Sequence, residues 1–198
     1  MPKKPTVPLK ITATLTNGRI ISADGIIMFD AILYHAWFCK NHPEVFITGK
    51  WRLHGAGFIG LPLRQLPGNR WAASRGIYTE IAQNIEQWGN TRQLIRIVDK
   101  TMEFYCMGNA AKIMELLTNM RGIGKETSMG WGAVEKWEAE EIEADYSLIH
   151  PVHGLMRPTP VEEIDEANLP AKYPVIKYAV KPPYWKQENE RLCYVPLI

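Results

Sequence analysis

The segment 121–134, RGIGKETSMGWGAV, constrains this chain more than any other. It places four glycines within 11 residues, between a stretch with helical periodicity and a stretch that alternates like a strand. Glycine has no Cβ, so it allows positive φ and close approach of the backbone to a ligand. A single glycine would be enough to end a helix and begin a connection. Four glycines with Ser, Thr and Lys among them favour a loop that holds a phosphate backbone against its amide groups.

The residues of this loop that we expect to contact a phosphate backbone are Arg121, Gly122, Gly124, Lys125, Gly130, Trp131 and Gly132. The loop does not match a P-loop, because it follows a helix and precedes a strand rather than the reverse. Trp131 is either a platform for base stacking or a core residue that holds the end of the loop, and both interpretations stay open here.

Hydrophobic periodicity predicts the elements near the N-terminus. Residues 9–20 alternate like a half-buried strand and contain an Asn-Gly turn signal. Apolar residues then recur at helical spacing over 25–40, and Ser22 or Asp24 is the candidate cap. The Asn-His-Pro sequence that follows predicts the end of this helix.

The middle of the chain is richer in strand signals. Residues 45–80 are broken up by glycine and proline, which predicts short β segments, including one over 70–78. Residues 91–107 predict two strands joined at Asp-Lys. Residues 108–120 predict a helix capped by Asn109, with a buried stripe formed by Ile113, Leu116, Leu117 and Met120.

Residues 133–144 alternate like an edge strand, with Val134 and Trp137 on opposite faces. The order of elements is then β-α-β-β-α-β, which predicts an α+β domain of ferredoxin-like (RRM-like) type over residues 1–144. Residues 145–198 contain eight prolines and few helix signals. We expect them to form an extended Pro-rich C-terminal tail that packs on the domain or on a partner, without a second core.

The net charge of +2 hides an asymmetry along the chain. Residues 1–132 hold 16 Lys/Arg and 9 Asp/Glu, whereas residues 133–198 hold 7 and 12. Within 46–79 there are five basic residues, interleaved with aromatic residues, and no acidic one. This pattern is typical of a polyanion partner, although an uneven solvated surface over an aromatic core is the alternative. The basic candidates are Lys50, Arg52, Arg64, Arg70 and Arg75.

Catalytic and metal signals are sparse. His35 and Cys39 have helical spacing on an apolar segment, where a packed histidine is the commoner outcome, so we expect no metal and no cofactor. His35, His42 and His54 are the candidates for a general base in RNA cleavage by the 2′-hydroxyl. No second catalytic partner stands out by spacing. A protein-interaction module with a glycine-rich hinge is a third interpretation.

The composition also bears on cellular location. The three cysteines are widely spaced, which suggests reduced thiols in a cytoplasmic protein. The longest apolar-rich stretch is interrupted by Asp30 and His35 and is too short to span a bilayer.

Three segments resemble a known family. Residues 121–137, RGIGKETSMGWGAVEKW, resemble the glycine loop of the RAMP superfamily of CRISPR RNA-binding proteins. Residues 23–37, ADGIIMFDAILYHAW, are similar to the segment that leads into the first helix in its short members. Residues 154–162, GLMRPTPVE, resemble a segment of the type IV branch. In size and layout the chain looks most like the Cas5-type subunit of a type IV effector complex.

That resemblance implies a non-catalytic subunit that caps a ribonucleoprotein complex, with a role in interference against viruses and plasmids. It implies binding of the five-prime handle of the guide RNA near the target DNA duplex. The implied protein partners are the backbone-forming RAMP subunit, the large subunit and a helicase. It also implies that the glycine loop contacts RNA and that residues 46–79 form an inserted β-rich thumb. Because the same superfamily contains the guide-RNA processing endonuclease, a metal-independent nuclease with a histidine base is the alternative.

Overall fold

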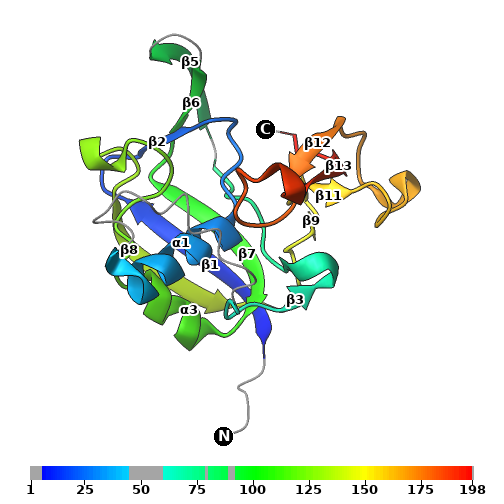
Figure 1. Ribbon diagram of the computed structural model, residues 1–198, viewed down its shortest axis with the longest axis horizontal. Coiled ribbons are helices and arrows are strands. Elements are labelled where there is room, and N and C mark those ends of the chain that lie inside the picture. The colour runs from blue at the N-terminus through cyan, green and yellow to red at the C-terminus, as the bar shows by residue number, and fades with distance from the viewer. Residues whose placement is uncertain (1–5, 45–59, 79, 89–91, 198) are drawn as a thin grey trace, which may run out of the picture.

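The computed structural model describes residues 6–44, 60–78, 80–88 and 92–197, which form a mixed α/β structure made mostly of strands (Figure 1). Its central sheet is antiparallel and has the order β7-β1-β8, with strands β1 (Val7–Leu15), β7 (Thr101–Gly108) and β8 (Val134–Glu141). The predicted alternation is confirmed in β1, since Leu9, Ile11 and Ala13 are fully buried.

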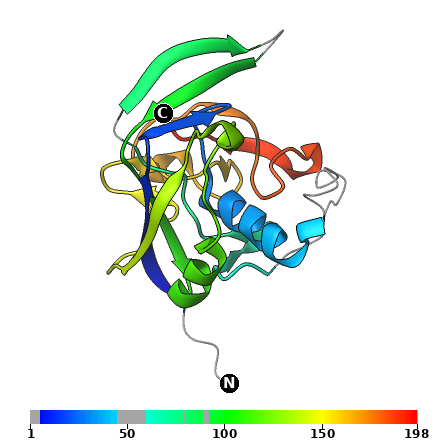
Figure 2. The same cartoon turned by 90° about the vertical axis from the view of Figure 1, so that its left-hand side faces the viewer.

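Helices α1 (Phe29–Asn41) and α3 (Ala110–Leu117) cover one face of this sheet (Figure 2). The predicted second helix is confirmed: the Asn109 side chain accepts a hydrogen bond from the Lys112 amide, as an N-cap does. Ile113 and Leu117 of α3 are fully buried against the sheet. Leu116 and Met120, the other members of the predicted stripe, are partly buried at its margin.

The predicted start of the first helix at residue 25 is wrong, because α1 begins at Phe29 with Met28 as its N-cap residue. Ser22 and Asp24 do bond backbone amides, but those of Gly25 and Ile26, so they stabilise a turn instead of the helix. The apolar residues before α1 are held extended because they pack on the C-terminal part of the chain, in a cluster formed by Ile26, Met28, Val180, Cys193 and Val195.

A second sheet has the order β2-β6-β5, with strands β2 (Arg19–Ser22), β5 (Glu80–Trp88) and β6 (Arg92–Val98). The prediction of two strands joined at Asp-Lys is confirmed, but the strands belong to different sheets, since β6 pairs with β2 and β7 pairs with β1. In both ribbon views the β5–β6 hairpin projects from the body of the molecule, and β2 joins it to the body (Figures 1 and 2).

The region predicted to hold an inserted thumb is described from residue 60 onward, and residues 45–59 lie outside the described part. A short hairpin, with strands β3 (Gln65–Leu66) and β4 (Arg70–Trp71), surrounds the predicted turn at Pro67–Asn69. The predicted strand over 70–78 is wrong as a continuous element. Beyond β4 its residues join β7 at isolated bridges, Ala73 with Cys106 and Ile77 with Glu103, and through backbone bonds of Ala72 and Ser74.

Residues 145–198 include a three-stranded sheet in the order β11-β13-β12, with strands β11 (Thr159–Pro160), β12 (Val175–Ala179) and β13 (Glu190–Tyr194). A two-stranded ladder precedes it, formed by β9 (Ile149–His150) and β10 (Gly154–Leu155). These elements pack on the domain through buried contacts. Arg157, which lies between β10 and β11 and is 1% exposed, is the largest of the fully buried side chains in the described residues. The boundary between residues 144 and 145 stays a prediction.

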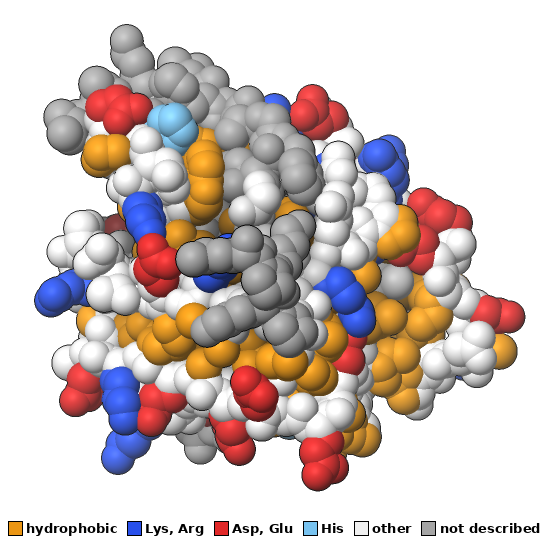
Figure 3. Space-filling model, turned by 90° about the horizontal axis from the view of Figure 1, so that it is seen from below, with side chains coloured by type: hydrophobic (Ala, Val, Ile, Leu, Met, Phe, Trp, Pro, Cys, Tyr) orange, Lys and Arg blue, Asp and Glu red, His pale blue; other side chains and the backbone are white. Residues whose placement is uncertain are grey.

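Seen from below, hydrophobic side chains form a band across the molecule, with charged side chains along its margins (Figure 3). Exposed apolar area of this kind is typical of surfaces that contact other proteins. No helix in the described part of the chain is long and apolar enough to cross a membrane.

Candidate nucleic-acid interface

The glycine loop is folded against strand β2. The Lys125 amide donates to the Ile21 carbonyl at 2.8 Å, and the Gly132 amide donates to the Arg19 carbonyl at 2.7 Å. The base of the loop is closed by the Ile123 amide, which donates to the Gly132 carbonyl at 2.9 Å. Both ends of this loop are therefore fixed by backbone hydrogen bonds.

Two of the glycines are required by this docking. Gly124 has φ +83°, and a Cβ there would lie 2.5 Å from the Ile21 carbonyl oxygen. Gly132 has φ +62°, and a Cβ there would overlap the Ile123 carbonyl oxygen. No side chain fits at either position, because the neighbouring atoms belong to the backbone and cannot move aside.

The tip of the loop is different. Residues 126–130 are exposed and include a 3-10 turn over Thr127–Met129. Gly130 has φ +85°, yet nothing lies within 4 Å of where its Cβ would be. The loop therefore presents open backbone at its tip while its base is tightly packed.

Cations surround this loop. Arg121 is exposed and Lys125 half-buried, and among the described residues neither forms an ion pair. Trp131 is half-buried and interacts within the chain.

The structure adds two cations that the sequence reasoning missed, Arg19 and Lys100. Both are exposed, and Arg19 lies beside the loop because its carbonyl accepts the Gly132 amide. Lys100 lies near the same turn, since its carbonyl accepts the Leu15 amide and the Asp99 amide donates to Gly18. The Asn17 side chain also donates to the Gly130 carbonyl at 2.8 Å. Both turns were recognisable in the sequence, but their contact across the two sheets was not.

The other predicted basic residues lie elsewhere. Arg70 is 4% exposed, donates to the Pro67 carbonyl at 3.0 Å and pairs with Glu163. Its hairpin, β3–β4, lies apart from β2 in both ribbon views (Figures 1 and 2). Arg70 therefore has almost no surface to offer a phosphate in this arrangement.

Arg75 and Arg64 also have partners within the chain. Arg75 is 8% exposed, its guanidinium donates to the Leu197 carbonyl at 3.2 Å, and burial lowers its pKa. Arg64 is half-exposed and pairs with Asp145 at 2.6 Å. Lys50 and Arg52 lie outside the described residues. Of the predicted cations, the structure brings only Arg121 and Lys125 together at the loop.

Among the described residues there is no group of three or more His, Cys, Asp or Glu side chains that could hold a metal ion. The His35 ring lies 3.5 Å from the Cys39 sulfur on the same helix, and His42 Nδ1 lies 3.3 Å from a Glu44 carboxylate oxygen. His54 lies outside the described residues.

Comparison with known proteins adds the family. A search of curated proteins finds no match. A family model described as CRISPR type IV associated protein Csf3 matches residues 68–196, which is well over half of the chain. The matched region includes the glycine loop, the edge strand β8 and the C-terminal sheet, but not Arg19 and the rest of strand β2. The chain therefore belongs to the family of the CRISPR type IV associated protein Csf3.

Proposed function

We propose that this chain is a non-catalytic RNA-binding subunit of a type IV CRISPR effector complex. In this proposal it caps the complex and binds the five-prime handle of the guide RNA near the target DNA duplex. The observation that supports it best is the glycine loop: its exposed tip around Gly130 is held near Arg19 by the bond from the Gly132 amide to the Arg19 carbonyl, and Arg19, Arg121 and Lys125 form no ion pairs among the described residues.

The strand order supports a ferredoxin-like domain. In such a fold the last strand lies beside the first, and the first lies beside the third. The order β8-β1-β7, with α1 and α3 on one face, matches that arrangement. The segment that bridges β7 at Leu63, Ala73 and Ile77 occupies the position of the second strand. This likeness favours the RAMP superfamily as the wider group.

The loop suits a sugar-phosphate backbone more than a base. The Gly130 amide donates to the Thr127 carbonyl at 3.0 Å, so in this proposal the phosphate oxygens are bound by guanidinium groups near the exposed tip, where no side chain at Gly130 blocks their approach. Arg19 and Arg121 would supply those groups. Such contacts hold a nucleic acid in place without reading its sequence, as expected for a constant handle.

We also assign the gripping role of a thumb to the β5–β6 hairpin instead of residues 60–78. Strand β2 pairs with β6 along one edge and holds the glycine loop along the other, because Ile21 is paired with Arg96 and also bridges Lys125. The hairpin and the loop therefore belong to one continuous surface. In this proposal the RNA handle lies across both.

The remaining partners follow from the same proposal. As a member of this family the chain is expected to assemble with other type IV CRISPR subunits. We propose the backbone-forming subunit and the large subunit as its neighbours, target DNA as a nearby ligand, and a helicase as a further partner in the cytoplasm.

The test is retention of guide RNA by the complex. We expect Arg19→Glu and Arg121→Glu together to weaken retention of labelled guide RNA about 10-fold or more, because each reversal also repels a phosphate. Lys112→Glu together with Lys172→Glu is the matched control, since it makes the same two charge reversals at exposed positions away from the loop. Equal retention by the double variant and the control would reject the interface.

The endonuclease alternative has one observation in its favour, which is the contact of His42 with Glu44. A carboxylate beside an imidazole can orient it as a general base. Labelled repeat RNA incubated with the purified chain in EDTA separates the two functions. Intact RNA supports the binding subunit, whereas cleavage that is lost in His42→Ala supports the nuclease.

A further inference from the structure

Strand β8 has an open edge. In the central sheet β8 pairs with β1 on one side, and within the described residues no strand pairs with its other side beyond the Gly122–Ala133 bridge at its start. An unpaired edge presents amide and carbonyl groups that can bond a further strand.

The hydrogen-bond pattern identifies the free groups. The Ile142 amide donates to the Pro8 carbonyl, and the Leu15 amide donates to the Lys100 carbonyl of the opposite neighbour. The backbone amide and carbonyl groups of the even-numbered residues of β1 therefore point toward β8. In the register of this pair, the backbone groups of Trp137, Ala139 and Glu141 in β8 point away from β1. These three residues are where an added strand would bond.

The edge is also acidic. Residues 134–143 contain five glutamates and one lysine, and the strand is exposed from Glu138 to Glu141. Lys136 is paired with Glu138 at 2.7 Å and Lys10 with Glu140 at 2.9 Å, whereas Glu135, Glu141 and Glu143 have no ion pair among the described residues, so the edge keeps a net negative charge. Charge on an edge strand discourages pairing with copies of itself, but it attracts a strand of opposite charge.

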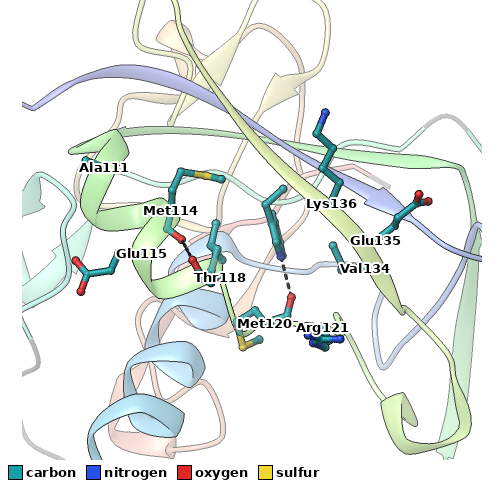
Figure 4. A pocket seen from close by; sticks show the side chains of 11 residues that line it. Ala111, Met114, Glu115, Thr118, Met120, Arg121, Val134, Glu135 and Lys136 are labelled. Carbon is teal, nitrogen blue, oxygen red and sulfur yellow. Dashed lines mark hydrogen bonds between the residues drawn. The ribbon is translucent and has the colours of Figure 1, made fainter.

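A groove of about 520 Å³ adjoins this edge, between the last turn of α3 and the start of β8 (Figure 4). Met114, Met120, Val134 and Trp137 supply its apolar lining, and the Trp137 indole is fixed by donating to the Met120 carbonyl at 2.9 Å. The volume is within the range of about 300–1,000 Å³ that is usual for ligand pockets, so it can hold a large apolar side chain.

Glu115, on α3, and Glu135, on β8, lie on opposite sides of the groove, and Arg121 and Lys136 also line it (Figure 4). Lys40, 2.5 Å away, lowers the pKa of Glu115 and keeps it ionised. The lining of the groove itself is balanced, with two carboxylates and two cations, so the acidic charge of this edge lies further along β8, from Glu138 to Glu141. A phosphate backbone along β8 would be repelled, which favours a basic peptide over RNA as the occupant.

We propose that the β8 edge binds an extended basic segment of another subunit of the complex, which adds a strand to the central sheet. Backbone bonds to residues 137, 139 and 141 hold this segment, its Lys or Arg side chains face the glutamates, and one apolar side chain fills the groove. Addition of a strand to a sheet edge is a common mode of peptide recognition. This proposal rests on assembly with other type IV subunits and not on the RNA interface.

Hydrogen exchange of the assembled complex against the free chain is the direct test. We expect amides in residues 135–141 to exchange about 10-fold or more slowly after assembly with the subunits encoded beside this one, because the outward amides become bonded. Carbodiimide cross-linking should then join Glu138 or Glu141 to partner lysines. Assembly without this protection, or protection caused by guide RNA alone, would overturn the proposal.

Two variants make the test independent of folding. Ala139→Pro removes an outward amide without breaking a bond to β1, and Glu138→Lys with Glu141→Lys reverses the local charge. We expect each to reduce co-purification of the partner about 10-fold, while RNA retention by the free chain is unchanged. Glu162→Lys with Glu166→Lys, on exposed positions of the tail, is the matched control. Co-purification equal to that control would also overturn it.

Discussion

The buried arginine of the C-terminal part offers a sharp test of how that part is held to the domain. Arg157 is 1% exposed and donates to the backbone carbonyls of Trp71, Ala73 and Val180. Its guanidinium also lies 3.9 Å from Asp30, which is fully buried. The perturbation is Arg157→Met, which keeps much of the volume and removes every hydrogen bond and the charge.

The expected cost follows from what the substitution leaves behind. Three buried carbonyls lose a donor, and the carboxylate of Asp30 keeps only the Tyr184 hydroxyl, 2.8 Å away, as a side-chain donor. Breaking a buried pair by removing one partner costs about 3–5 kcal/mol, because the other charge stays buried. We therefore expect the free energy of unfolding to fall by about 3–5 kcal/mol near neutral pH.

The loss should also depend on pH. Burial raises the pKa of Asp30, although Arg157 and Tyr184 oppose this shift, so removal of Arg157 raises that pKa further. A carboxyl whose pKa is higher in the folded state stabilises that state fully at pH values below its unfolded pKa, about 3.9. This stabilisation is lost as the pH rises through the folded-state pKa. The cost of Arg157→Met should therefore be smaller near pH ~3, where Asp30 is largely neutral in both states, than near neutral pH.

Urea unfolding followed by tryptophan fluorescence measures both quantities. Arg191→Met is the matched control, because Arg191 is exposed and bonds only nearby carbonyls. It should change stability by less than about 0.5 kcal/mol. A loss below about 1 kcal/mol for Arg157→Met, or a loss that shrinks as pH rises, would refute the buried-pair reasoning.

Three further predictions concern the glycine loop and its neighbours. Gly132→Ala should destabilise the chain by about 2–5 kcal/mol, because it combines a positive φ with overlap of a backbone oxygen. Gly130→Ala should cost only about 1–2 kcal/mol, for the positive φ alone. Thermal melts of the two variants measure the difference, and equal losses of stability would contradict the geometry. Asn109→Ala should cost about 1 kcal/mol through loss of the helix cap, and an unchanged melting temperature would count against it. The salt dependence of guide-RNA binding should decrease by about 0.7 in log–log slope for Arg19→Ala and for Arg121→Ala, and an unchanged slope would show that these residues contact no phosphate.

Local patterns predicted most of the secondary structure because the forces that form it are local. The alternation in β1 and the cap and stripe of α3 follow from neighbours within a few residues. The pattern misled at β8, where strict alternation puts Val134 and Trp137 on opposite faces. Both pack on the same core, because the pairing with β1 shifts between Thr14 and Leu15 and leaves Glu135 as an extra residue.

The candidate site was predicted in part for the same reason. The glycine loop lies on one short segment, so its composition was enough to single it out. Arg70 and Arg75 looked like solvent cations in a stretch without acids, yet the C-terminal part covers both and supplies Glu163 and the Leu197 carbonyl. These partners lie 93 and 122 residues away, a separation at which no periodicity gives a signal.

By itself, the sequence determined the strand β1, the helix α3, the glycine loop and the asymmetry of charge, since these depend on residue type and spacing alone. Only the tertiary structure decided which cations stay in solvent, which glycines are required, and that Arg19 and Lys100 join the loop. Burial and charge pairing depend on which distant segments come into contact. The packing of the whole chain brings β2 against the glycine loop and Asp30 close to Arg157.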